Sequence, residues 1–155
     1  MKRIIIFGAS SGIGELLAKK YAQQGNRVCA CARRMERLQQ LKSLYPNEIE
    51  VYDVDVASAW QQEGASAQDT VGYKFSKMVK VMGGVDLVIY CSGVGKQNKM
   101  LDMGIECSTI NVNVKGFTAV VNATVEYAKS VTHNVQFATI ASVASVRGIS
   151  ISASY

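Results

Sequence analysis

Apolar runs alternate along this chain with segments that have helical periodicity. Ile4 to Phe7 is an unbroken apolar run, which is typical of a strand covered on both faces. The apolar residues from Ile13 to Tyr21 then recur at helical spacing, and Gly25 is placed to end that helix. A strand followed closely by a helix predicts the first half of a βαβ unit.

The same alternation continues to the end of the sequence. Further strands are predicted over residues 28–32, 50–56, 85–90 and 135–140, and further helices over 35–44, around Phe75 to Met82 and over 109–131. The stretch 57–84 begins as a loop or short turn, and 96–104 is polar and loop-like. Five strands and four helices in this order predict an α/β fold, with a doubly wound parallel sheet of the Rossmann type and strand order 3-2-1-4-5. The strand over 135–140 then forms one edge.

Composition narrows the class of protein. Of the 155 residues, 48% are apolar and 19% are charged, and proline occurs once, which excludes a disordered or collagen-like chain. No linker rich in Pro, Gly or Ser divides the chain, so we expect a single domain over residues 1–155. No apolar run approaches the roughly 20 residues of a membrane helix, so no membrane partner is expected. Cys29 and Cys31 would share one face of a strand, which favours a reduced, cytoplasmic chain over a secreted one with disulfides.

The distribution of charge argues against nucleic-acid binding, and the lack of clustered ligand residues argues against metal binding. Residues 1–42 carry nine Lys and Arg against Glu15 and Glu36, so the anion preference belongs to this part of the chain. No cluster of aromatic residues is interleaved with these charges, and we therefore do not expect a nucleic-acid partner. The chain has no Cys-x-x-Cys pair or Cys/His cluster, and its one histidine, His133, lies in a polar connection where a solvated side chain is expected. No metal site is predicted.

A glycine-rich loop lies between the first strand and the first helix. At this point the chain must turn sharply, and the N–H groups at the start of the helix attract phosphate. Glycine permits close approach of a pyrophosphate and of the helix to the strand. The alternative is an ordinary glycine turn, but the strand–turn–helix context favours a dinucleotide site. The candidate residues of this loop are Gly8, Ser10, Ser11, Gly12, Ile13 and Gly14.

Four further motifs follow this loop in order. They are Asp55-Val56 after the third strand, Cys91-Ser92-Gly93 after the fourth, Asn113 to Phe117 in the long helix, and Ser142 thirteen residues before Tyr155. With the Gly-x-x-x-Gly-x-Gly loop they resemble the short-chain dehydrogenase/reductase family along the whole chain. Phe7 stands where the family usually has Thr, and Cys91-Ser92 replace Asn-Ala. The resemblance implies that an Asn bracing neighbouring strands is lost there.

The resemblance implies an oxidoreductase that transfers a hydride between a nicotinamide and a small carbonyl or alcohol substrate. Tyr155 would donate the proton that the developing alkoxide needs. Ser142 would hold the substrate oxygen, and Asn113 would bend the long helix locally and anchor a water. The residues that the resemblance adds as cofactor contacts are Asp55 near the adenine, Val56, and the turn of Cys91, Ser92 and Gly93.

The end of the second strand predicts which cofactor is preferred. An acidic residue there would bind the ribose hydroxyls of NAD and repel a 2′-phosphate, but this chain has Ala32 followed by Arg33-Arg34. A guanidinium binds phosphate bidentately, so Arg33, helped by a hydroxyl of Ser10 or Ser11, predicts NADP rather than NAD. The alternative is that both arginines simply open a surface helix.

One departure from the family bears directly on activity. The family has a Lys four residues after the active-site Tyr, and this sequence stops at Tyr155. The resemblance therefore implies a chain without the family's C-terminal segment, and a homo-oligomer is expected for the full-length family member. The alternative is a non-catalytic nucleotide-binding or regulatory domain, if the chain truly ends at Tyr155.

Overall fold

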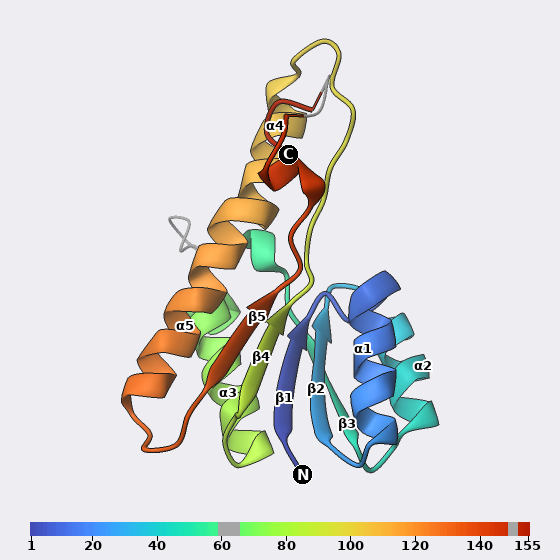
Figure 1. Ribbon diagram of the computed structural model, residues 1–155, viewed down its shortest axis with the longest axis vertical. Helices are drawn as coiled ribbons and strands as arrows, with labels where there is room; N and C mark the ends of the chain where they lie inside the picture. Colours follow the sequence, from blue (N-terminus) through green and yellow to red (C-terminus); the bar gives the residue numbers. More distant parts are fainter. Residues whose placement is uncertain (59–65, 149–151) are drawn as a thin grey trace.

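A parallel sheet forms the centre of the chain in the computed structural model, which describes residues 1–58, 66–148 and 152–155 (Figure 1). Its strands are β1 (Arg3–Phe7), β2 (Arg27–Ala32), β3 (Ile49–Asp53), β4 (Leu87–Tyr90) and β5 (Gln136–Thr139). They lie in the order β3-β2-β1-β4-β5, and every neighbouring pair is parallel. The predicted α/β fold and strand order are confirmed, with β5 at an edge.

Helices cover both faces of the sheet (Figure 1). α1 (Gly12–Gln23) and α2 (Met35–Leu44) pack on the face that Ile4 and Ile6 of β1 present. α3 (Val71–Met82) packs on the opposite face, against Ile5 and Phe7. A long helix also covers that face, and its parts are α4 (Met103–Ile110), a π-helical segment η3 (Asn111–Gly116) and α5 (Phe117–Lys129). Each β1 isoleucine is fully buried, as expected for a central strand covered on both faces.

The cysteines agree with the predicted register. Cys29 and Cys31 are buried on one face of β2, where the Sγ of Cys31 lies 3.1 Å from the Sδ of Met78. Burial raises the pKa of the Cys31 thiol well above its ordinary value. All four cysteines are free thiols.

The largest differences between the observed and predicted element boundaries lie at three places. The third strand ends at Asp53 instead of Val56, because the chain turns where the Asp55 carboxylate accepts a hydrogen bond from the backbone N–H of Ala57. α3 begins at Val71, where Thr70 caps it, and residues 59–65 of the predicted loop lie outside the described chain. The long helix begins at Met103 rather than 109, because Asp102 accepts from the N–H of Ile105.

An ion pair joins the amino ends of β1 and β4, at the side of the sheet opposite to the predicted site residues. Arg3 of β1 donates to both carboxylate oxygens of Asp86, at 3.0 and 2.6 Å, and lowers the pKa of Asp86 to about 2. His133 lies beside this pair, with its Nε2 3.0 Å from the carbonyl oxygen of Val85. The His133 side chain is 38% exposed. This agrees with the expected solvated position in a loop, apart from its contact with the Val85 backbone.

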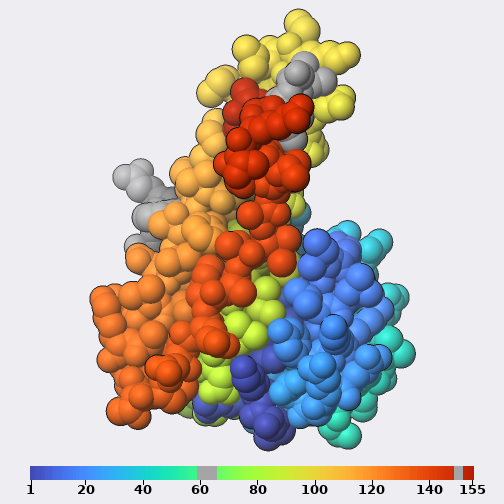
Figure 2. Space-filling model, viewed as in Figure 1, coloured from blue at the N-terminus to red at the C-terminus, as the bar shows by residue number. Residues whose placement is uncertain are grey.

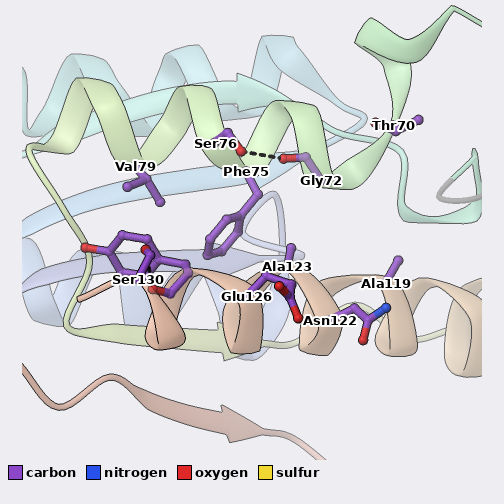
Figure 3. A pocket seen from close by; sticks show the side chains of 11 residues that line it. Thr70, Gly72, Phe75, Ser76, Val79, Ala119, Asn122, Ala123, Glu126 and Ser130 are labelled. Atoms are coloured by element: carbon purple, nitrogen blue, oxygen red, sulfur yellow. Dashed lines mark hydrogen bonds between the residues drawn. The ribbon is translucent and has the colours of Figure 1, made fainter. Parts of the chain in front are cut away.

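A groove of about 680 Å³ lies between α3 and α5. Figure 3 shows Phe75 and Val79 of α3 pointing toward α5, where Ala119 and Ala123 form the other wall. The predicted site residues lie elsewhere, beyond the carboxyl ends of the strands. In the described part of the chain, no helix has the length and apolar character of a membrane span. Nor do three His, Cys, Asp or Glu side chains gather there as metal ligands would.

Candidate active site

The glycine-rich loop packs its backbone against two other elements. Gly8 has φ +85°, and a Cβ on it would lie 2.7 Å from the backbone nitrogen of Ser92. Gly14, in the first turn of α1, lies so close to Gly8 that a Cβ would approach the Gly8 carbonyl carbon to 2.9 Å. Only glycine allows the loop, α1 and the turn after β4 to meet at this distance. The carbonyl oxygen of Cys31 accepts from the N–H groups of Gly8 and Ala9 and ties the loop to β2.

A cleft of about 140 Å³ opens above this loop, at the carboxyl ends of the strands. It lies where the strand order reverses between β1 and β4, the usual place for a ligand in such a sheet. The predicted cofactor residues that line it are Gly8, Ser10, Ser11, Arg33, Asp55, Val56, Cys91, Ser92 and Gly93. Of the remaining three, Ile13 lines a larger neighbouring cavity, while Gly12 and Gly14 shape the loop without lining either space in the described chain.

Two arginines and two serine hydroxyls meet at one side of the cleft. Arg34 donates from Nε and Nη2 to the Oγ of Ser10, at 3.1 and 3.0 Å, and from Nη2 to the Oγ of Ser11, at 2.6 Å. Arg33 is exposed and lines the same cleft. Sequence reasoning selected Arg33 and did not include Arg34. The two adjacent arginines were the signal in the sequence that could have indicated Arg34. The chain bends after Ala32, however, so the alternation of side chains along the strand no longer predicts where each arginine points.

The predicted catalytic residues share the larger cavity, of about 630 Å³. Asn113, Ser142 and Tyr155 all line it, although they come from the long helix and from the segment after β5. Cys91, Ser92, Gly93 and Val94 line both the cavity and the cleft, so the two spaces adjoin. The structure thus brings the predicted catalytic and cofactor residues to one edge of the sheet.

Asn113 lies in the π-helical segment of the long helix. Its Nδ2 donates to the carbonyl oxygen of Val94 at 2.7 Å, and its Oδ1 accepts from the Val94 N–H at 2.9 Å. The hydroxyl of Tyr90 donates to the carbonyl oxygen of Val112 at 2.6 Å, so this carbonyl has a partner outside the helix. Such an inserted side-chain bond is a common cause of a local helix distortion. The two hydrogen bonds between Asn113 and Val94 fix the loop that follows β4.

Gly116 ends the π-helical segment close to Val56 and Tyr90. A Cβ on Gly116 would lie 2.8 Å from the carbonyl oxygen of Val56 and 3.0 Å from the hydroxyl oxygen of Tyr90. Burial raises the pKa of Tyr90, so its phenol stays protonated and remains a donor. Burial also raises the pKa of the Cys91 thiol to about 11, and Cys91 is therefore uncharged near neutral pH.

The segment that leaves β5 carries Ser142 and Tyr155. It is the red end of the chain in Figures 1 and 2. The Oγ of Ser142 accepts from the N–H of Ala144 at 3.2 Å, a bond that uses a lone pair of the hydroxyl and not its proton. The ring of Tyr155 lies against Gly95, where a Cβ would be 2.7 Å from the ring carbon Cε2. The Tyr155 side is open, with 43% of the residue exposed.

A family model described as short chain dehydrogenase matches residues 2–155. This chain belongs to the short chain dehydrogenase family. An uncharacterized oxidoreductase of Staphylococcus epidermidis is 29% identical to the chain over 128 residues, which are 81% of this chain and 52% of that protein. The NADP-dependent 3-hydroxy acid dehydrogenase YdfG of Escherichia coli is 38% identical over 53 residues, 34% of this chain and 21% of that enzyme.

Solved structures of other dehydrogenases superpose on the chain. One from Mycobacterium smegmatis has a TM-score of 0.85 at 20% identity and covers 97% of this chain and 61% of its own, which shows the fold. An alcohol dehydrogenase from the archaeon Thermococcus sibiricus, complexed with 5-hydroxy-NADP, has a TM-score of 0.79 at 28% identity and covers 97% and 62%. This short chain dehydrogenase sequence spans about half the length of the curated relatives it matches first.

Proposed function

We propose that this chain forms the cofactor cleft and part of the catalytic site of an NADP-dependent oxidoreductase acting on a small carbonyl or alcohol substrate. The observation that carries the proposal is the pair of adjoining spaces, one bordered by Arg34, Ser10 and Ser11 and the other lined by Ser142 and Tyr155. The structurally similar alcohol dehydrogenase from Thermococcus sibiricus is complexed with 5-hydroxy-NADP, which supports this choice of cofactor.

The residues around the cleft fit a dinucleotide phosphate. Gly8 and Gly14 leave a cradle that a Cβ would fill, and the N-terminus of α1 adds a partial positive charge for a pyrophosphate. Arg33 and Arg34 would hold a 2′-phosphate, since a guanidinium suits bidentate binding and Ala32 brings no negative charge to the end of β2. Asp55 and Val56 would lie by the adenine, and Cys91, Ser92 and Gly93 would border the path to the catalytic cavity.

The bound cofactor would supply or accept the hydride, and the residues of this chain would handle the proton. We assign the proton donor to the hydroxyl of Tyr155, which would protonate the carbonyl oxygen during reduction and take the proton back during oxidation. Ser142 would donate its O–H to the same oxygen, since the bond it accepts from Ala144 does not use that proton. Asn113 would act through Val94, by keeping the wall of the cavity in place.

The proposal includes a small-molecule carbonyl or alcohol as the partner and a cytoplasmic location, which the four free thiols support. A homo-oligomer stays a prediction for the full-length family member. The direct test is NADPH oxidation with a panel of ketones and aldehydes, using the chain alone and the chain extended by the family's segment with its Lys. The proposal expects turnover in the extended protein. Cofactor binding without turnover by either form would favour a non-catalytic nucleotide-binding domain.

A further inference from the structure

Tyr90 is the last residue of β4, and its side chain lies on the face of the sheet that the long helix covers. Val88 and Tyr90 belong to the core cluster on that face, and the residues that alternate with them belong to the cluster on the other face. The Tyr90 ring packs edge-on against Phe117, with 5.6 Å between the ring centroids. Only 3% of Tyr90 is exposed, so its hydroxyl needs a partner inside the molecule.

The partner of the Tyr90 hydroxyl is the peptide unit that leads into Asn113. The hydroxyl donates to the carbonyl oxygen of Val112 at 2.6 Å. Burial raises the pKa of Tyr90, so the phenol keeps the proton that it donates. In a regular α-helix a carbonyl accepts from the N–H four residues further on, but Val112 lies in the π-helical segment. Because Val112 directly precedes Asn113, the bond from Tyr90 holds the peptide unit from which Asn113 starts.

Asn113 forms the second attachment between the same two elements. Its side chain donates to the carbonyl oxygen of Val94 at 2.7 Å and accepts from the Val94 N–H at 2.9 Å. Val94 comes four residues after Tyr90, so the stretch 90–94 is attached to the π-helical segment at both of its ends. Gly116 limits the space around the first attachment, because a Cβ there would lie 3.0 Å from the Tyr90 hydroxyl oxygen. The Tyr90 bond therefore restricts how the backbone at Asn113 can turn.

We propose that Tyr90 is a positioning residue for Asn113, and that its hydroxyl sets the peptide unit from which Asn113 reaches Val94. This inference rests on the proposed function, because the position of Val94 affects turnover only if the adjoining cavity holds the substrate. Tyr90 borders that cavity, but its hydroxyl is bonded to Val112, so its effect passes through Asn113 and Val94. Val94 borders both the cofactor cleft and the cavity. Reaction rates are sensitive to such placement, and a displacement of about 1 Å can lower the rate on the order of 100-fold.

The first arm of the test observes the attachment without any turnover. In the ¹⁵N-labelled 155-residue chain, Tyr90→Phe should shift the side-chain amide resonances of Asn113. It should also speed hydrogen exchange at the Val94 N–H roughly two- to tenfold, the effect of losing one hydrogen bond. Tyr127→Phe is the matched control, because the Tyr127 hydroxyl also bonds to the backbone, accepting from the Val85 N–H at 3.2 Å. Both variants should lower the melting temperature, but only Tyr90→Phe should change these two signals. Unchanged signals in Tyr90→Phe, or equal changes in both variants, overturn the inference.

A double-mutant cycle tests whether Tyr90 acts through Asn113. Asn113→Ala removes both bonds to Val94, so exchange at the Val94 N–H should rise, and adding Tyr90→Phe should then raise it no further. Additive increases overturn the inference. If Tyr90→Phe does not fold, the wild-type chain decides, because the Tyr90 hydroxyl proton should show a nuclear Overhauser effect to the Hα of Asn113. Absence of that effect also overturns the inference.

The second arm measures NADPH oxidation in the extended protein. Tyr90→Phe should lower kcat on the order of tenfold, because the wall formed by Val94 is displaced, whereas Tyr127→Phe should keep the wild-type kcat. In the Asn113→Ala background, Tyr90→Phe should cause no further loss of kcat, since the attachment through which it acts is already gone.

The two arms separate this inference from the proposed function. If the wild-type extended protein turns over no carbonyl, the proposed function fails, and exchange at Val94 still decides whether Tyr90 positions Asn113. If the wild type is active and Tyr90→Phe keeps its kcat, the positioning role is wrong and the proposed function stands. Equal losses of kcat in Tyr90→Phe and Tyr127→Phe would show a general structural defect and also contradict the inference.

Discussion

The cofactor side and the catalytic side of this molecule are built in different ways. Around Gly8, backbone atoms hold the site together. The loop donates hydrogen bonds to the Cys31 carbonyl oxygen, and it approaches Gly14 and Ser92 at distances that exclude any Cβ. Ile4 to Phe7 of β1, beneath the loop, are fully buried. This half is assembled from neighbouring strands and helices, so its geometry follows from the order of elements and the placement of glycine.

On the catalytic side, side chains make the long-range connections. Asn113 binds Val94, and the ring of Tyr155 lies against Gly95, each pair joining parts of the chain far apart in sequence. Tyr155 itself is 43% exposed. A site held in this way depends on a few individual hydrogen bonds, whereas the cofactor loop depends on the whole sheet. The comparison predicts that substitutions on the catalytic side change activity more than folding, and that those in the loop change both.

The largest effect is expected from removing the proton donor. In the extended protein, Tyr155→Phe keeps the ring against Gly95 but deletes the hydroxyl, and it should lower kcat by about 10²- to 10⁴-fold. Ser142→Ala should cost less, because it removes one hydrogen bond to the substrate oxygen. Steady-state NADPH oxidation measures both. Tyr73→Phe, at a partly exposed position of α3, is the control. A Tyr155→Phe enzyme with wild-type activity would place the chemistry elsewhere.

The next effect concerns the glycine loop. Gly8→Ala brings a Cβ within 2.7 Å of a backbone atom that cannot yield cheaply, so we expect both a lower melting temperature and loss of NADPH binding. Gly25→Ala is matched to it, because Gly25 also has positive φ, at +73°, but a Cβ there would meet nothing within 4 Å. It should show only the cost of the left-handed conformation, roughly 1–2 kcal/mol. Equal losses of NADPH binding in the two variants would contradict the proposed role of the loop.

A smaller effect should distinguish the two arginines at the cleft. Arg34→Ala removes the bonds to Ser10 and Ser11 and should weaken NADPH binding about ten- to a hundredfold, the value of one charge-assisted contact of roughly 1.5–3 kcal/mol. NADH binding should change little, since NADH has no 2′-phosphate. The same titration with Arg33→Ala tests the residue favoured from the sequence. If only Arg33→Ala weakens NADPH binding, Arg34 is a structural residue of the loop.

The smallest effect lies at the far end of the strands. The pKa of Asp86 is lowered to about 2 in the folded chain, so its ion pair with Arg3 stabilises the fold at pH values above the unfolded value near 4. This stabilisation should decline as the pH falls from about 4 through 2. Asp86→Asn should therefore reduce the free energy of unfolding by about 1–2 kcal/mol at pH 7 and by less at pH 2. Urea denaturation at both values tests this, with exposed Asp69→Asn as control.

The sequence predicts the cofactor side better than the catalytic side for a physical reason. The unbroken run from Ile4 to Phe7 and the glycines after it are local signals, and the structure has the predicted strand, turn and helix there. The contact of the Tyr155 ring with Gly95 joins two segments that share no periodicity, so no pattern indicates it. The early start of the long helix was in principle visible, because Asp102 is a good N-cap residue, but the polar character of 96–104 masked it.

The central claim is that the cleft beside Gly8 binds NADP through the arginines after β2. Titration of the purified 155-residue chain with NADPH and with NADH, followed by cofactor fluorescence, tests it most directly. We expect NADPH to bind about ten- to a hundredfold more tightly than NADH, and we expect Arg34→Ala to remove most of this difference. Equal affinities in the wild-type chain, or a preference for NADH, would contradict it.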